Sequence, residues 1–155
     1  MTVKPIPEGY TSITPYLTLD DGQGAIEFYK RAFGATERGR MAMPDGKIAH
    51  AELQIGDAVL MLSDRFPQFV GQTPTELGGT TVSIFLFVED VDSVVRDAAE
   101  AGAKITMQPE DQFWGDRMGQ VTDPFGHLWQ IATRVEDLTP EEIEARGQSV
   151  MAGMA

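Results

Sequence analysis

The chain has 155 residues, of which 42% are apolar and none is cysteine, and its formal net charge is −12. This length predicts one domain, or two small modules that share a core. Without cysteine there are no disulfides and no zinc–thiolate sites, and the excess of carboxylates disfavours nucleic acid and anionic membranes as partners. The longest apolar runs are too short to span a bilayer, and the N-terminal residues lack the apolar stretch of a secretory signal. We therefore expect a cytoplasmic protein that has neither nucleic acid nor a membrane as a partner.

The first half of the chain predicts a strand, a helix and three further strands. Residues 12–19 alternate with period two, and Pro15 among them favours an edge strand or a β-bulge. Asp21 is placed to cap a helix over residues 23–33, where apolar side chains recur at helical spacing. Three segments joined by turn signals follow and read as strands: 36–43, 47–55 and 58–63.

The second half repeats this order. A strand is expected at residues 82–88, a helix at 91–101, and three more strands at 104–108, 117–122 and 128–133. Three pairs of positions keep nearly the same separation along the chain: Thr14 with Ser83, Gly34 with Gly102, and Met61 with Gln130. An internal repeat of this kind decides the fold.

The repeat divides one domain, residues 1–155, into parts. Module one covers about 12–64, a linker rich in proline and glycine covers 65–80, and module two covers about 81–133. Thr139 and Pro140 predict a C-terminal helix over about 139–147. We expect the residues beyond Gly147 to be frayed.

The expected fold class is α+β: two tandem βαβββ modules with pseudo-twofold symmetry, whose mixed sheets curve round a central cleft. The apolar face of each sheet buries the helix of its own module, and the other face looks into the cleft. The residues expected on the inward faces are Thr14, Tyr16, His50, Glu52 and Met61 in module one and Ser83, Phe85, Phe87 and Gln130 in module two. This mixture of polar and aromatic groups suits a small-molecule site better than a packed core.

Several motifs resemble those of the vicinal-oxygen-chelate superfamily. They are the paired modules, Asp21 before Ile26-Glu27-Phe28-Tyr29, and the turn Asp123-Pro124-Phe125-Gly126-His127. The superfamily includes glyoxalase I, extradiol dioxygenases, fosfomycin-resistance enzymes and bleomycin-resistance proteins. Finer features are similar to its PhnB-like branch: His50-Ala51-Glu52-Leu53, Met61-Leu62-Ser63-Asp64 and Trp114-Gly115-Asp116-Arg117. The resemblance covers residues 12–133 and implies a homodimer, in which modules can be exchanged between chains.

The resemblance also bears on metal binding. In the metal-dependent members, a divalent ion is held in the cleft by residues of the first and fourth strands of both modules. The matching positions here are Thr14, Met61, Ser83 and Gln130, and none of these is a histidine or a carboxylate. Two hydroxyls, a thioether and an amide are poor ligands for such an ion. We therefore expect no metal cofactor, with a displaced divalent ion on His50 and Glu52 as the alternative.

His50 and Glu52 are the foremost chemical candidates. Two residues apart on one strand, they share a face at a Cα separation of about 7 Å. One interpretation is acid–base catalysis, with Glu52 orienting His50. The others are a displaced metal site, and a polar pair that binds ligand without chemistry.

The remaining candidates are predicted to bind ligand. Tyr16, Phe85 and Phe87 either stack on an aromatic ligand or fill the cleft, and Met61 and Gln130 complete the lining. Trp114 and Arg117 are expected at the mouth of the cleft, where an arginine can grip a carboxylate or phosphate with two hydrogen bonds. The alternative there is an ion-pair network of Asp116 and Arg117 at a subunit contact. His127 is expected to be a hydrogen-bonded turn residue that faces away from the cleft.

These features predict a protein that binds a small organic molecule without a metal, similar to the drug-sequestering members of the superfamily. The first alternative is a small lyase or isomerase that uses His50 and Glu52 as its acid–base pair. The second is an interaction module that has no ligand.

Overall fold

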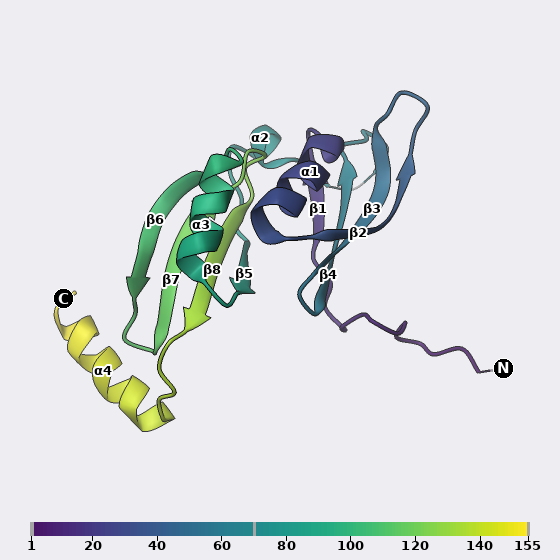
Figure 1. The fold of residues 1–155 in the computed structure, drawn as a ribbon. Helices are drawn as coiled ribbons and strands as arrows, with labels where there is room; N and C mark the ends of the chain where they lie inside the picture. The colour runs from purple at the N-terminus through teal and green to yellow at the C-terminus, as the bar shows by residue number, and fades with distance from the viewer. Residues whose placement is uncertain (1, 70, 155) are drawn as a thin grey trace. The chain divides into compact units, whose positions relative to one another are not determined.

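The computed structural model describes residues 2–69 and 71–154, within which it forms two four-stranded mixed sheets, each packed against a long helix (Figure 1). By its internal contacts the chain splits into two units. One takes in the residues up to Thr81 together with Pro124–His127, and the other takes in Val82–Asp123 and the residues from Leu128 onward.

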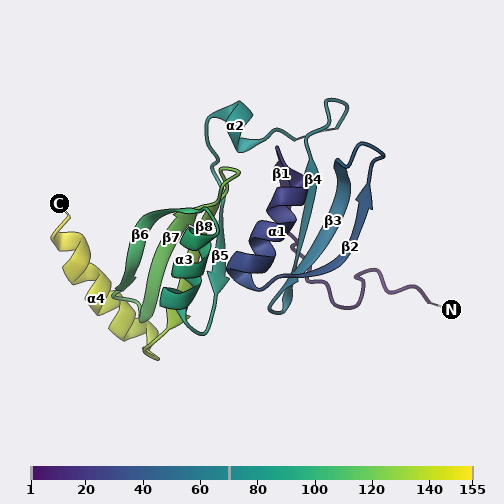
Figure 2. The ribbon, with the colours of Figure 1, turned by 45° about the horizontal axis from the view of Figure 1, so that its top comes forward.

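The first unit holds a sheet of strand order β1-β4-β3-β2. Its elements are β1 (Tyr16–Leu19), α1 (Gly22–Phe33), β2 (Thr36–Ala42), β3 (Ile48–Ile55) and β4 (Ala58–Asp64), followed by the short α2 (Pro74–Leu77). Asp21 caps α1 by accepting a hydrogen bond from the backbone N–H of Gly24, as expected. Both views show α1 across one face of the sheet (Figures 1 and 2), where it buries residues such as Phe28 and Tyr29.

The second unit repeats this arrangement with strand order β5-β8-β7-β6. Its elements are β5 (Ser83–Phe87), α3 (Val91–Glu100), β6 (Lys104–Asp111), β7 (Asp116–Thr122), β8 (Leu128–Arg134) and the C-terminal α4 (Pro140–Ala152). Helix α3 packs on β6, β7 and β8 (Figure 2). It buries Val91, Val95 and Ala98.

Strand register confirms the repeat. Tyr16 pairs with Met61 in the parallel β1–β4 ladder, and Phe85 pairs with Gln130 in the parallel β5–β8 ladder. The fold class is therefore α+β with two tandem βαβββ modules, as the sequence predicted. Pro15 precedes the edge strand β1, where its carbonyl accepts a hydrogen bond from the N–H of Met61.

Some element limits differ from those expected. Thr14 lies before β1, and the segment expected to be a linker contains α2, which Thr73 and Glu76 close with a capping box. Helix α4 continues past Gly147 to Ala152, where we expected frayed chain. Gly147 lies against the ring of Phe113, and this packing holds that part of the helix in place. None of the described helices is long and apolar enough to cross a membrane.

The turn before β8 packs in the first unit. The ring of Phe125 meets Phe28 and Tyr29 of α1 edge to face, with ring centroids 6.2 and 6.5 Å away. The Nε2 atom of His127 donates to the carbonyl oxygen of Thr18 at 3.1 Å, since a carbonyl can only accept. His127 is thus a hydrogen-bonded turn histidine, as expected.

An ion-pair network joins the end of α1 to β2. Glu37 accepts two hydrogen bonds from Arg40, at 2.6 and 2.8 Å, and one from Lys30 at 3.1 Å. The hydrogen bonds from Arg40, with the one from Lys30, lower the pKa of Glu37 to about 2 against the opposing effect of burial. Because folding lowers the pKa of Glu37, its carboxylate contributes full stability at pH values above its ordinary pKa of 4.5. This contribution is lost as the pH falls towards 2.

Replacing Glu37 with Gln is expected to lower the free energy of unfolding by about 1 kcal/mol at pH 7, because solvent screens the network. The difference from the unmodified protein should shrink as the pH falls from 4.5 towards 2. Urea unfolding followed by circular dichroism at several pH values measures this. Glu27→Gln, which removes a single exposed contact to Lys30, is the control. A difference that does not change with pH would contradict the assignment.

Candidate functional site

One face of the first sheet is left uncovered by α1, and we call it the first open face. Strand register lines up Tyr16, Met61, Glu52 and Gly39 across it, one from each of β1, β4, β3 and β2. Residues directly opposite one another on paired strands share a face. His50 lies two residues before Glu52 and therefore on the same face.

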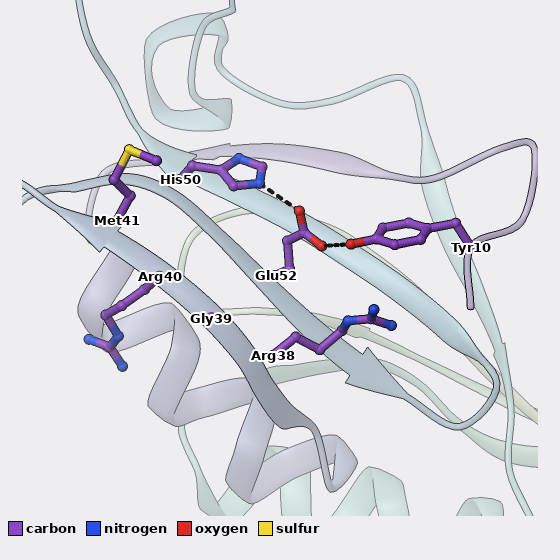
Figure 3. Close-up of a pocket in the computed structure, with 7 residues that line it drawn as sticks. All are labelled: Tyr10, Arg38, Gly39, Arg40, Met41, His50 and Glu52. Atoms are coloured by element: carbon purple, nitrogen blue, oxygen red, sulfur yellow. Dashed lines mark hydrogen bonds and ion pairs between the residues drawn. The ribbon is translucent and has the colours of Figure 1, made fainter. Parts of the chain in front are cut away.

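A chain of hydrogen bonds crosses the first open face. The Nδ1 atom of His50 lies 3.0 Å from the hydroxyl of Tyr16, and its Nε2 atom lies 2.9 Å from one oxygen of Glu52. The other oxygen of Glu52 accepts a hydrogen bond from the hydroxyl of Tyr10 (Figure 3). Because an ionised carboxylate only accepts, Nε2 carries a proton, and in the neutral imidazole Nδ1 accepts from Tyr16. Glu52 therefore orients His50, and the hydrogen bond joins two residues that the sequence placed on one face of a strand.

These hydrogen bonds change the pKa values of Glu52 and Tyr10. Hydrogen bonds from His50 and then Tyr10 hold the pKa of Glu52 below its ordinary value, against the effect of burial. The same carboxylate raises the pKa of Tyr10 above its ordinary value. Glu52 is consequently ionised and Tyr10 neutral at physiological pH.

Two hollows flank Tyr10 and Glu52. The first has a volume of about 360 Å³ and is lined by Tyr10, Glu52, His50 and residues 38–41 of β2 (Figure 3). The second has a volume of about 450 Å³ and lies under the N-terminal segment, with Met61 and Glu52 in its lining. Ligand pockets commonly measure about 300–1,000 Å³. The first open face therefore offers room for a small molecule beside fixed polar groups.

The second module carries the other predicted lining residues on the corresponding face. The rings of Phe85 and Phe87 lie 5.0 Å apart and are 42% and 58% exposed. Gln130 donates a hydrogen bond of 2.6 Å to the hydroxyl of Ser83. A small hollow of about 120 Å³ adjoins this pair.

Trp114 and Arg117 both donate to carboxylates of the second unit. Arg117 lies on the side of β7 that faces α3, with Asp92 at 2.8 Å and Asp111 at 3.2 Å. Trp114 donates its indole N–H to Asp116 at 3.0 Å. Asp116 itself pairs with Arg134, so Asp116 and Arg117 form ion pairs with other partners and not with each other, as one of the two sequence-based alternatives had them do.

Comparison with known proteins places the chain. The model of the Glyoxalase/Bleomycin resistance protein/Dioxygenase superfamily matches residues 11–131. The chain belongs to this superfamily. Among its relatives is the uncharacterized protein Rv0887c of Mycobacterium tuberculosis, 47% identical over 137 residues, which cover 86% of this chain and 81% of the relative.

Solved structures show the same fold. TioX from Micromonospora is 29% identical with a TM-score of 0.64, and the match covers 81% of this chain and 99% of TioX. The PhnB protein from Bacillus cereus is 19% identical with a TM-score of 0.62, and the match covers 79% of this chain and 99% of PhnB. The PhnB-like resemblance of the sequence therefore extends to the fold.

The positions that the family resemblance implies for a metal ion carry Thr14, Met61, Ser83 and Gln130. Thr14 and Met61 offer a hydroxyl and a thioether, and the amide of Gln130 is already bonded to Ser83. Within residues 2–69 and 71–154 there is no group of three or more His, Asp or Glu side chains arranged to hold a metal ion.

Of the residues that line the first hollow, the sequence indicated only His50 and Glu52; Tyr10 and residues 38–41 of β2 were missed. Tyr10 comes from the proline-punctuated segment before β1, whose path no pattern indicates. Arg38 is displaced by a β-bulge, for which Gly39 inside a strand pattern was an available signal.

Proposed function

We propose that the protein binds a small organic molecule on the first open face, in the hollows beside His50 and Glu52. The observation that carries the proposal is the hydrogen-bonded chain of Tyr16, His50, Glu52 and Tyr10, which lies at the edge of open space of ligand size. Fixed polar groups next to exposed apolar side chains such as Met41 are the usual composition of a ligand site.

Binding is expected to depend on the two central residues. His50→Ala removes the group that bridges Tyr16 and Glu52, and Glu52→Gln removes the charge that fixes His50 and Tyr10. Each should weaken binding at least tenfold, the usual effect of losing a charge-assisted hydrogen bond. Isothermal titration against a panel of metabolites and antibiotics measures this, and Glu27→Gln on the exposed side of α1 is the control. Unchanged affinity in both site variants would overturn the proposal.

The alternative function is that of a small lyase or isomerase. It is favoured by one observation, which is that a carboxylate orients one nitrogen of His50 while the other nitrogen bonds the half-exposed Tyr16. On this alternative, His50→Ala abolishes turnover of a bound compound while its affinity stays within a few fold. If His50→Ala loses affinity and the unmodified protein shows no turnover, the result supports a protein that binds its ligand without catalysis.

We also propose that the protein acts in the cytoplasm as a homodimer, as the family resemblance implies. Sedimentation velocity at micromolar concentration should then give twice the mass of one chain. A single species of one chain's mass would overturn the dimer and leave the proposed binding site on the first open face unaffected.

A further inference from the structure

We infer that the ligand of the first hollow is an organic anion and that Arg38 binds its carboxylate or phosphoryl group. The inference rests on the proposed function, since it names the chemical class of the molecule bound on the first open face. Arg38 lines the first hollow together with Tyr10, His50 and Glu52.

A β-bulge turns Arg38 onto this face. Glu37 pairs with Leu53 and Gly39 pairs with Glu52, so β2 has one residue more than β3 at this point. Leu53 is buried on the side of α1, whereas Glu52 lies on the first open face. Regular alternation would put Arg38 on the side opposite to Gly39, but the extra residue re-aims it.

The contacts of Arg38 place its guanidinium group in the hollow. Its Cζ atom lies 4.7 Å from the centre of the Tyr10 ring, and its Nη1 atom donates to Gln54 at 3.0 Å. Both contacts hold the group without neutralising it, and Figure 3 shows Arg38 extending from β2 in a different direction from Arg40. The planar guanidinium has five N–H donors, of which the bond to Gln54 uses one.

No carboxylate in the described part of the chain forms an ion pair with Arg38. Its neighbour Arg40 differs, because Glu37 engages it through both oxygens. In a chain with 24 acidic and 12 basic residues, carboxylates are abundant enough to pair with most arginines. Glu52 is the acidic residue that lines the same hollow, and both of its oxygens accept hydrogen bonds from His50 and Tyr10. An anion with two oxygens matches the geometry of the guanidinium edge.

Gly39 leaves the space that such a ligand needs. A Cβ atom built on Gly39 would meet no atom within 4 Å, and the residue does not have a positive φ. Gly39→Val would therefore fill the hollow from β2 without backbone strain, and valine suits a strand better than glycine does. This gives an occlusion variant that should fold at least as well as the unmodified protein.

The test uses matched acid and amide probes. Benzoate and phenylphosphonate are titrated into the full chain labelled with ¹⁵N, with benzamide as the neutral counterpart, and backbone amide shifts are followed. The two acids are expected to shift the amides of residues 38–41 and His50 saturably, with dissociation constants of about 1 mM for probes of this size. Benzamide should bind at least tenfold more weakly.

Two variants of equal charge separate the site from the overall charge of the protein. Arg38→Gln should weaken binding of the acids at least tenfold and remove their advantage over benzamide. Arg31→Gln, on the exposed surface of α1, should leave their affinity within twofold. Gly39→Val should abolish the shifts caused by both the acids and the amide.

The outcomes distinguish this inference from the proposed function. If acids and amide bind equally and Gly39→Val abolishes binding of both, the hollow is a ligand site but not an anion site, and the inference fails alone. Unchanged acid binding in Arg38→Gln has the same meaning. If none of the probes shifts any resonance of the first open face, the inference is overturned together with the proposed site.

Discussion

Replacing Asp64 with Ala is expected to lower the free energy of unfolding by about 3 kcal/mol. Asp64 is the last residue of β4 and is buried, with 7% of its surface exposed. One of its oxygens accepts a hydrogen bond of 2.7 Å from the N–H of Gly22, and the other accepts one of 2.6 Å from the N–H of Ile48. Alanine would leave both buried donors without this acceptor, at about 1–3 kcal/mol for each.

The position of Asp64 explains why one side chain has so large an effect. Gly22 begins α1 and Ile48 begins β3, so a single carboxylate fixes the starts of two elements to the end of a third. Its negative charge also lies at the N-terminus of α1, where the helix dipole favours it. Urea unfolding followed by far-ultraviolet circular dichroism measures the change.

Two further variants make the experiment on Asp64 specific. Asp64→Asn keeps one acceptor oxygen and should lose about half as much stability as Asp64→Ala. Asp45→Ala removes an aspartate that accepts from the N–H of Lys47 in an exposed turn, and should cost less than about 0.5 kcal/mol. A loss for Asp64→Ala no larger than that for Asp45→Ala would contradict the role given to Asp64.

The fold was predictable from the sequence because the repeat and the turn residues agree. Asp21 and Gly34 mark the start and end of α1, and the structure uses both in those roles. The positions aligned between the halves, such as Met61 and Gln130, occupy equivalent places in the two sheets. Local turn chemistry and the long-range pattern here specify the same topology.

The candidate site was predictable only where it follows regular alternation. His50 and Glu52 share a face because they are two residues apart on an unbroken strand, and their side chains do meet. Arg38 could not be assigned this way, because the bulge in β2 changes which face a residue occupies. Tyr10 could not be assigned either, because its position depends on a tertiary contact with Glu52 and on no local pattern.

The surroundings of Arg117 could not be predicted from the sequence either. The start of β7 lacks a clear alternation of polar and apolar residues, so the sequence does not indicate which face of the sheet Arg117 occupies. The structure pairs this arginine with Asp92 at the start of α3. A role for Arg117 in ligand binding stays a prediction, whereas Arg38 lines the first hollow and has no carboxylate partner within the described residues.

Replacing Trp129 with Ala is expected to lower the free energy of unfolding by about 3–5 kcal/mol, the usual cost of deleting a large buried ring. Trp129 lies on β8 with 1% of its surface exposed, beside Ile84 on β5 and Val121 on β7. It is the largest of the fully buried side chains described in the protein. Its removal would leave a cavity under α3 that a four-stranded sheet can close only in part.

The indole N–H adds a polar contribution that can be measured separately. Trp129 donates to the buried Asp123 at 3.0 Å, and Trp114 donates to Asp116 at the same distance. Trp129→Phe keeps most of the ring volume and should cost about 1–3 kcal/mol, because Asp123 loses a donor in a buried setting. Trp114→Phe is the matched control, since Trp114 is only half-buried and Asp116 keeps its ion pair with Arg134. Equal losses for the two phenylalanine variants would show that burial of Asp123 does not set the cost.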